Sequence, residues 1–210
     1  MFDLMPGAVL QEPAEEISQV YFPLEGAACV FHEAHEQAPA RSVLIGRDGA
    51  LGASAAIGNR RSFSRTTVVT AGRAIRTSAA YLRQKSRENR EINTAMARHE
   101  LAVLGRGQMG ASCNGSHALE RRLASWISQA GDCGGVISGL TPELLSCTLE
   151  ASGQSVRQAT EELVQTGLVA LDGRGFTVRD TTGLSEACCE CRHALIANHP
   201  YVPLPLSSNV

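Results

Sequence analysis

The sequence predicts an α+β protein in three successive parts, and three features of the chain support this division. Short segments rich in β-branched and aromatic residues, separated by Gly and Pro, occupy roughly the first eighty residues. From Ser78 to Cys113 the chain contains no Pro and consists mostly of helix-forming residues. The last third has the order helix, short turn, helix and hairpin, which is the order of a winged helix-turn-helix.

The composition is that of an ordinary globular protein. Of the 210 residues, 43% are hydrophobic and 19% are charged, with a formal net charge of -2. The apolar runs are far shorter than the roughly 20 residues of a membrane helix, and no basic segment precedes an apolar stretch at the start, as a signal peptide requires. The seven cysteines, an odd number, argue for a reducing compartment. We therefore expect a cytoplasmic protein with no membrane partner.

The strand-rich part is predicted to be a sandwich or barrel, because many short strands alternate with regular turn signals. A polar hairpin tip is expected over residues 32–40. The predicted strands are four: Val20–Phe22, Ala28–Phe31, Ser42–Ile45 and Thr66–Thr70.

The predicted central helix carries a heptad-like stripe, which favours packing against a second copy of the same helix. The alternative is one amphipathic helix that lies on its own domain. Four residues of the stripe recur every seventh position and three lie between them: Ile92, Ala95, His99, Ala102, Arg106, Met109 and Cys113.

Several helix and turn signals follow the break expected at Asn114-Gly115. A helix is predicted over residues 117–129. Thr141 and Pro142 form a helix start as N-cap and first helical residue. A second helix, over about residues 154–166, ends at Gly167. The hairpin expected over residues 168–178 carries Arg174 at its tip.

The second helix is predicted to turn its apolar residues inward and a polar edge outward. The inward residues are Val156, Ala159, Leu163 and Val164. Gln pairs with adenine and Arg with guanine, and hydroxyls and arginines suit phosphates. A helical bundle with a terminal hairpin, used for protein contacts, is the alternative. The candidate residues for contacts with double-stranded DNA are Thr141, Gln154, Ser155, Arg157, Gln158 and Arg174.

A family resemblance rests on segments that follow one another in a fixed order. They are Val20–Pro23 with Gly26, Ile45–Gly49 with Leu51-Gly52, Gly72–Ala74, Glu120–Trp126, Leu140–Val156, Leu163–Val169, Gly183-Leu184 and Ala187–Cys191. Taken together over residues 5–192, these segments resemble the Crp/Fnr superfamily of bacterial transcription regulators. The resemblance implies a β-roll (jelly-roll-like) sensor domain over residues 1–86, a dimerisation helix over 87–113 and a winged helix-turn-helix over 114–210. It further implies a homodimer on a near-palindromic site, with RNA polymerase as a candidate partner.

The chain also departs from that family's pattern. The Glu that follows the glycine in relatives that bind cyclic AMP is missing after Gly46, and Ser64 stands where their phosphate-binding Arg would be. We therefore expect an effector other than cyclic AMP, or none. In the helix-turn-helix, Glu150 occupies a turn position that is usually Gly. The candidate effector-pocket residues are Gly46, Gly49, Gly52, Arg65 and Thr66.

No enzyme, cofactor or metal site is predicted. No Ser–His–Asp or Cys–His arrangement has supporting context, so no catalytic residue is expected. Cys188, Cys189 and Cys191 with His193 have spacing typical of metal ligands, but a second ligand pair at suitable spacing is missing. Whether these cysteines sense redox state or metal stays open at this point.

Two functional hypotheses remain from the sequence. The first is a dimeric DNA-binding regulator, favoured by the intact helix-turn-helix order and by Arg174. The second is a protein-interaction module of the same fold that has lost specific DNA binding. The acidic last third and the altered reading positions Gly153 and Gln154 favour the second hypothesis.

Overall fold

The computed structural model describes residues 1–32, 41–134 and 136–197 of the chain. Residues 33–40 of the expected hairpin tip lie outside the described residues. The N-terminal part holds two antiparallel sheets, with strand orders β1-β7-β3 and β2-β6-β4-β5. This part is the expected β-roll. Its strands are β1 (Phe2–Leu4), β2 (Val9–Gln11), β3 (Gln19–Pro23), β4 (Ala27–His32), β5 (Arg41–Ile45), β6 (Arg65–Thr70) and β7 (Gly72–Ser78).

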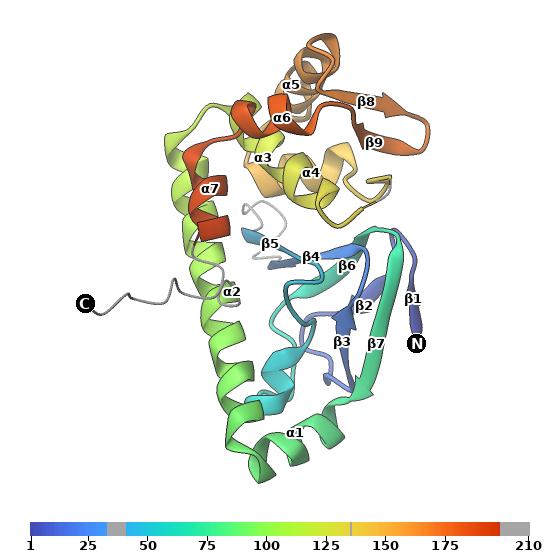
Figure 1. The fold of residues 1–210 in the computed structure, drawn as a ribbon, viewed down its shortest axis with the longest axis vertical. Helices are drawn as coiled ribbons and strands as arrows, with labels where there is room; N and C mark the ends of the chain where they lie inside the picture. The colour runs from blue at the N-terminus through green and yellow to red at the C-terminus, as the bar shows by residue number, and fades with distance from the viewer. Residues whose placement is uncertain (33–40, 135, 198–210) are drawn as a thin grey trace, which may run out of the picture.

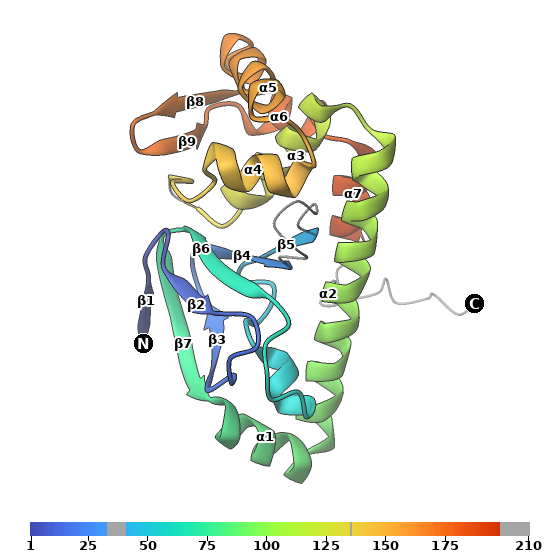
Figure 2. The same cartoon turned by 180° about the vertical axis from the view of Figure 1, so that it is seen from behind.

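Helices follow the sheets, and the longest of them, α2, runs along one side of the molecule past both of its parts (Figure 1; Figure 2). Among the described residues, no helix has the length and apolar character needed to cross a bilayer. The remaining elements are a 3-10 helix η1 (Ala53–Ile57), α1 (Ala79–Glu88), α2 (Arg90–Ser116), α3 (Leu119–Gly131), α4 (Pro142–Leu149), α5 (Gly153–Gln165), β8 (Val169–Asp172), β9 (Gly175–Val178), α6 (Thr181–Ala187) and α7 (Glu190–Ala197).

The four-stranded sheet is buried on both faces, which explains why its strands are apolar at consecutive positions. Side chains alternate between the two faces of a strand. Val68 and Ile45 pack inside the β-roll, whereas their neighbours Val69 and Leu44 pack against the helices of the C-terminal part. The C-terminal helices therefore share one hydrophobic core with the outer face of the sheet.

A close backbone contact accompanies this shared core. The Gly139 N–H donates to the Val69 carbonyl at 2.8 Å, and the Gly26 N–H donates to the Cys133 carbonyl at 3.2 Å. A Cβ atom on Gly139 would lie 2.5 Å from the Cα of Val69. Since two backbones cannot move apart as a side chain can, only glycine fits at this junction.

Helix α2 begins and ends at side-chain contacts. Asn89 caps its first turn by accepting hydrogen bonds from the backbone of Glu91 and Ile92. The break predicted at Asn114-Gly115 is wrong, because the helix continues to Ser116. The side chain of Asn114 accepts a hydrogen bond from Arg122 and donates one to the Thr148 carbonyl, so packing against α3 and α4 keeps this turn helical.

The C-terminal start and stop signals are confirmed. The Thr141 hydroxyl accepts from the Leu144 N–H at the start of α4, and Gly167 follows α5 with a φ of 75°. The inward position predicted for Val164 is wrong, since this side chain is 38% exposed. Thr160 takes the buried position one turn earlier and donates its hydroxyl to the Val156 carbonyl.

Glu150 ends α4 in the left-handed region, with a φ of 49°. We predict that Glu150→Gly raises the free energy of unfolding by about 1 kcal/mol, because glycine adopts this conformation without a Cβ clash. The matched control, Glu161→Gly in the exposed interior of α5, should lower it by about 1 kcal/mol. Urea denaturation measures both changes, and a loss of stability in Glu150→Gly would contradict the left-handed assignment.

Candidate nucleic-acid interface and effector cavities

The outer edge of α5 is open to solvent. Figures 1 and 2 show this helix at the end of the molecule farthest from α1, with the hairpin of β8 and β9 beside it. Val156 and Ala159 anchor its opposite face in the core. Arg157 forms no hydrogen bond or ion pair with any residue that the structure describes. The four predicted contact residues of this helix are all exposed: Gln154, Ser155, Arg157 and Gln158.

The first turn of α5 is capped by Ser152, a residue that the sequence analysis missed. Its Oγ accepts from the Ser155 N–H at 3.1 Å and lies 2.8 Å from the Ser155 Oγ. A serine directly before the first residue of a helix was the available signal. Free N–H groups and the positive dipole end make such a turn suited to a phosphate oxygen.

Arg174 stands at the tip of the hairpin, where its side chain is 79% exposed and 3.2 Å from a carboxylate oxygen of Asp172. The Arg174 backbone N–H also donates to this carboxylate and, with the side chain, lowers the pKa of Asp172. An exposed pair of this kind contributes little to stability, because water screens the two charges. The guanidinium can therefore exchange Asp172 for a phosphate.

The heptad residues that were expected at a partner interface lie on the inner face of α2. This face packs mainly against the chain's own β-roll. The His99 Nε2 accepts from the Ala50 N–H at 2.9 Å, and Arg106 lies 2.6 Å from a carboxylate oxygen of Asp48. Ile92 and Ala95 pack with the apolar residues around η1, Met109 lines a cleft beside β5, and Cys113 contacts Cys189; Ala102 is half-buried.

The outer face of α2 carries a second stripe with alternating spacings of four and three. Leu101 and Leu104 at its centre are 67% and 57% exposed. Large apolar side chains seldom stay this exposed on one helix face without a partner. We name the set the outer α2 stripe: Ala97, Leu101, Leu104, Gln108, Ala111 and Gly115.

A cavity of about 240 Å³ lies between the sheets of the β-roll and α2. It includes two of the five predicted pocket residues, Gly52 and Thr66. The amide nitrogen of Gln11 faces it as a buried donor without a hydrogen-bond partner among the described residues. His99 and Glu100 of α2 also line the cavity, so a molecule bound there would contact the helix directly.

The other three predicted pocket residues lie elsewhere. The Arg65 guanidinium is 2.7 Å from a carboxylate oxygen of Glu12 and does not line the cavity. Gly49 touches α2, since a Cβ there would lie 2.7 Å from the His99 Nε2. Gly46 lines a different cavity. Arg65 was expected in the pocket because Arg65-Thr66 resembles the Arg–hydroxyl pair that holds the phosphate in relatives that bind cyclic AMP. That resemblance does not give the direction of the Arg65 side chain on β6.

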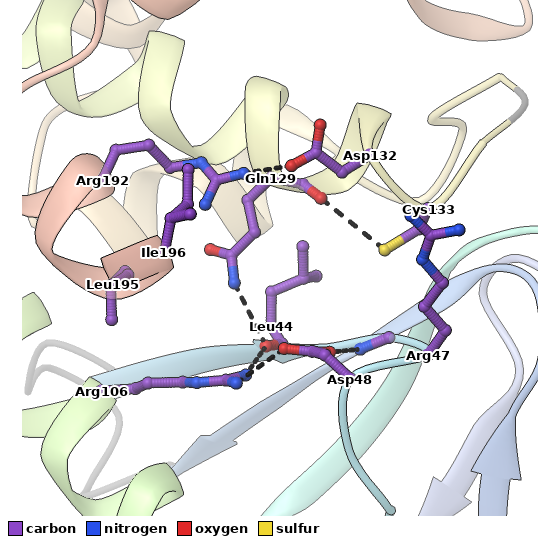
Figure 3. A pocket seen from close by; sticks show the side chains of 11 residues that line it. Leu44, Arg47, Asp48, Arg106, Gln129, Asp132, Cys133, Arg192, Leu195 and Ile196 are labelled. Atoms are coloured by element: carbon purple, nitrogen blue, oxygen red, sulfur yellow. Dashed lines mark hydrogen bonds and ion pairs between the residues drawn. The ribbon is translucent and has the colours of Figure 1, made fainter. Parts of the chain in front are cut away.

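The second cavity, of about 280 Å³, lies where the β-roll meets α2, α3 and α7. Figure 3 shows two ion pairs on its wall, Arg106 with Asp48 and Arg192 with Asp132. Gln129 reaches across it to the Leu44 carbonyl at 3.4 Å. Both parts of the chain therefore contribute to the wall of this cavity.

The C-terminal cysteines separate into two environments. Cys188 donates to the Leu184 carbonyl inside the core, and His193 is exposed. Cys189 and Cys191 instead approach the end of α2. Burial opposes the Cys189 thiolate, but hydrogen bonds from Ser125 and Cys113 outweigh it and lower its pKa. Burial raises the pKa of Cys191 and of Cys113.

This architecture is shared with proteins of known structure, although the sequence matches no known family. No protein-family model matches the chain, and no curated protein matches it. FixK2 from Bradyrhizobium japonicum is similar in structure at 11% identity, with a TM-score of 0.69 over 90% of this chain and 96% of that one. A CRP-family transcriptional regulator from Thermus thermophilus gives 17% identity and a TM-score of 0.66, over 89% and 96% of the two chains.

A third similar structure is CLP, the global regulator of Xanthomonas campestris that responds to c-di-GMP. It shares 13% identity, with a TM-score of 0.61 over 85% of this chain and 93% of that chain. At these identities the likeness concerns the fold. The chain therefore has the fold of CRP/FNR-type transcription regulators, from the β-roll to the C-terminal helices.

Proposed function

We propose that the protein is a DNA-binding transcription regulator that acts as a homodimer on a near-palindromic promoter site. One observation carries the proposal: the polar outer edge of α5 is exposed beside a hairpin with Arg174 at its tip. In a winged helix-turn-helix, α5 would enter the major groove while α4 crosses the backbone and the hairpin touches it. The similar fold of CRP/FNR regulators supports the same function.

The proposed contacts follow from position and chemistry. Gln154, Arg157 and Gln158 read bases, since their side chains can form paired hydrogen bonds with base edges. Ser155, Arg174 and Thr141 hold phosphates, since hydroxyl and guanidinium groups can donate to phosphate oxygens. No catalytic step belongs to this function, which is exercised in the cytoplasm with RNA polymerase as a candidate partner.

The proposed dimer forms through the outer α2 stripe. Two copies packed on this stripe about a two-fold axis would present both α5 helices on the same side. Half-sites would then lie about 34 Å apart, one turn of DNA. The proposed domains keep the boundaries 1–86, 87–113 and 114–210, with the helix of the middle part extended to Ser116.

The proposed effector is a molecule other than cyclic AMP, or the protein has none. A cyclic nucleotide carries a phosphate, and among the described residues no Arg or Lys lines the β-roll cavity. Arg65 is bound to Glu12, and Glu100 adds a carboxylate to the cavity wall. Burying an unpaired phosphate beside a carboxylate is unfavourable.

Two arginine substitutions test the proposed contacts with DNA. Arg157→Ala should reduce discrimination at one base pair by roughly 1–3 kcal/mol. Arg174→Ala should weaken binding to all DNA sequences alike and reduce the slope of log affinity against log salt concentration by about one. Binding of each variant to genomic fragments and to scrambled DNA at two salt concentrations measures both effects. An unchanged ratio of specific to non-specific affinity in Arg157→Ala would refute the reading edge. If neither variant differs from wild type, the chain is an interaction module.

Two leucine substitutions on α2 test the proposed dimer interface. Leu101→Glu and Leu104→Glu should each convert the dimer to a monomer, because a buried unpaired carboxylate opposes association. Leu171→Glu on β8 is the matched control, since this leucine is 49% exposed and lies away from α2. Light scattering at micromolar concentration measures the mass. A wild-type monomer, or a dimer that survives both α2 substitutions, contradicts this interface.

Titration with cyclic AMP tests the proposed exclusion of this nucleotide from the β-roll cavity. Calorimetric titration of the full chain with cyclic AMP should show no saturable heat at micromolar concentrations, because the cavity lacks a cation for the phosphate. The thermal midpoint should also stay unchanged, as a ligand without affinity for the folded state does not stabilise it. Saturable binding with a micromolar Kd would overturn the assignment of the cavity.

A further inference from the structure

Four metal-ligating side chains from two distant parts of the chain meet at the end of α2. Cys113 and His117 come from α2 and the residue after it, and Cys189 and Cys191 come from the start of α7. One ligand atom of each residue lies within 4.8 Å of those of the other three. The Sγ atoms of Cys113 and Cys189 are 3.5 Å apart, and the Cys191 Sγ is 3.7 Å from the His117 Nδ1.

These separations are those of ligands around a single ion. Zinc–sulfur bonds of about 2.3 Å and zinc–nitrogen bonds of about 2.0 Å give tetrahedral edges of about 3.8 Å between sulfurs and about 3.5 Å between sulfur and nitrogen. Three thiolates and one imidazole complete a tetrahedron without a water position, as in structural zinc sites. A polynuclear iron–sulfur cluster would need its cysteines spread over several iron atoms.

The groups around the four ligands are arranged as they are around bound metals. The His117 Nε2, on the far side of the ring from Cys191, lies 2.9 Å from a carboxylate oxygen of Glu190. A carboxylate in this position orients a ligating histidine and increases its basicity. On the other side, the Ser125 Oγ of α3 accepts a hydrogen bond from the Cys189 backbone N–H at 3.2 Å. The same Oγ lies 3.3 Å from the Cys189 Sγ.

We propose that Cys113, His117, Cys189 and Cys191 bind one zinc ion, which ties the C-terminal helix α7 to the end of α2. Soft thiolate ligands in a tetrahedral set select zinc among the common divalent cations. The bound ion would fix the DNA-binding part against the dimerisation helix, so its loss would loosen that attachment. This inference goes beyond the proposed function, and metal binding can be measured without DNA.

The site joins the predicted C-terminal cysteines to partners that were assigned to other roles. Cys113 was expected at the dimer interface, and His117 was given no role. His193, the histidine next to the cysteines in sequence, is exposed and lies outside the group of four. The missing second ligand pair is thus Cys113 and His117, four residues apart and therefore on one side of the helix end.

The test is metal titration of the reduced, chelator-treated full chain. Zinc should bind with one equivalent in competition with a chromophoric chelator, and cobalt should give the visible absorption of tetrahedral thiolate ligation. Glu190→Gln should weaken zinc binding by about 10–100-fold, and Cys191→Ser and His117→Ala should weaken it more. His117→Cys, which supplies a fourth thiolate, should restore binding of one ion.

Matched controls separate the site from general thiol chemistry. Cys147→Ser removes an exposed cysteine and His193→Ala an exposed histidine, so both should leave zinc binding unchanged. Circular dichroism shows whether each variant is folded. Zinc binding by His117→Cys is a positive result, which misfolding cannot produce. The proposal is overturned if zinc does not bind stoichiometrically, or if Cys191→Ser binds zinc as tightly as the wild-type chain does. It is also overturned if the protein shows an iron–sulfur spectrum instead of zinc binding, or if it forms a Cys113–Cys189 disulfide and has no metal affinity when reduced.

Discussion

The attachment of α2 to the β-roll determines how the rest of the molecule is organised. His99 accepts the Ala50 N–H, and Arg106 pairs with Asp48 in a half-buried setting. Because these two contacts lie seven residues apart, they fix one face of the 27-residue helix toward the strands. The opposite face, with Leu101 and Leu104, is then left for another molecule. The same attachment brings α2 to the walls of both cavities.

The two parts of the chain are coupled because they share one core and one helix. Val69 and Leu44 pack with the C-terminal helices, and Gly139 contacts the sheet backbone. A ligand in the β-roll cavity would press on α2, and α2 ends at the cysteine and histidine group beside α7. The proposed zinc ion would therefore stand between α2 and the C-terminal helices. These packed elements would connect a ligand in the β-roll cavity with the proposed base-reading edge of α5.

Most local signals were read correctly from the sequence, although the Ser152 cap was missed and a break was wrongly placed at Asn114-Gly115. Signals that depend on packing were not read correctly. Thr141 with Pro142 marks a helix start wherever it occurs, because the cap is a contact between near neighbours. Heptad spacing identifies a stripe but not which molecule covers it, so the stripe with His99 and Arg106 was assigned to a partner. The spacing that marks the outer α2 stripe was present as well. The metal ligands could not be paired, since 72 residues separate His117 from Cys189 in the chain and only folding brings them together.

Two copies joined through α2 are proposed to read DNA with two α5 helices. This arrangement can be tested by selecting bound molecules from a random DNA library with the purified full chain. We expect an enriched inverted repeat whose half-sites lie about 10 base pairs apart, centre to centre. Enrichment of one unsymmetrical half-site, or a bound pool that is no different from the starting library, would contradict it.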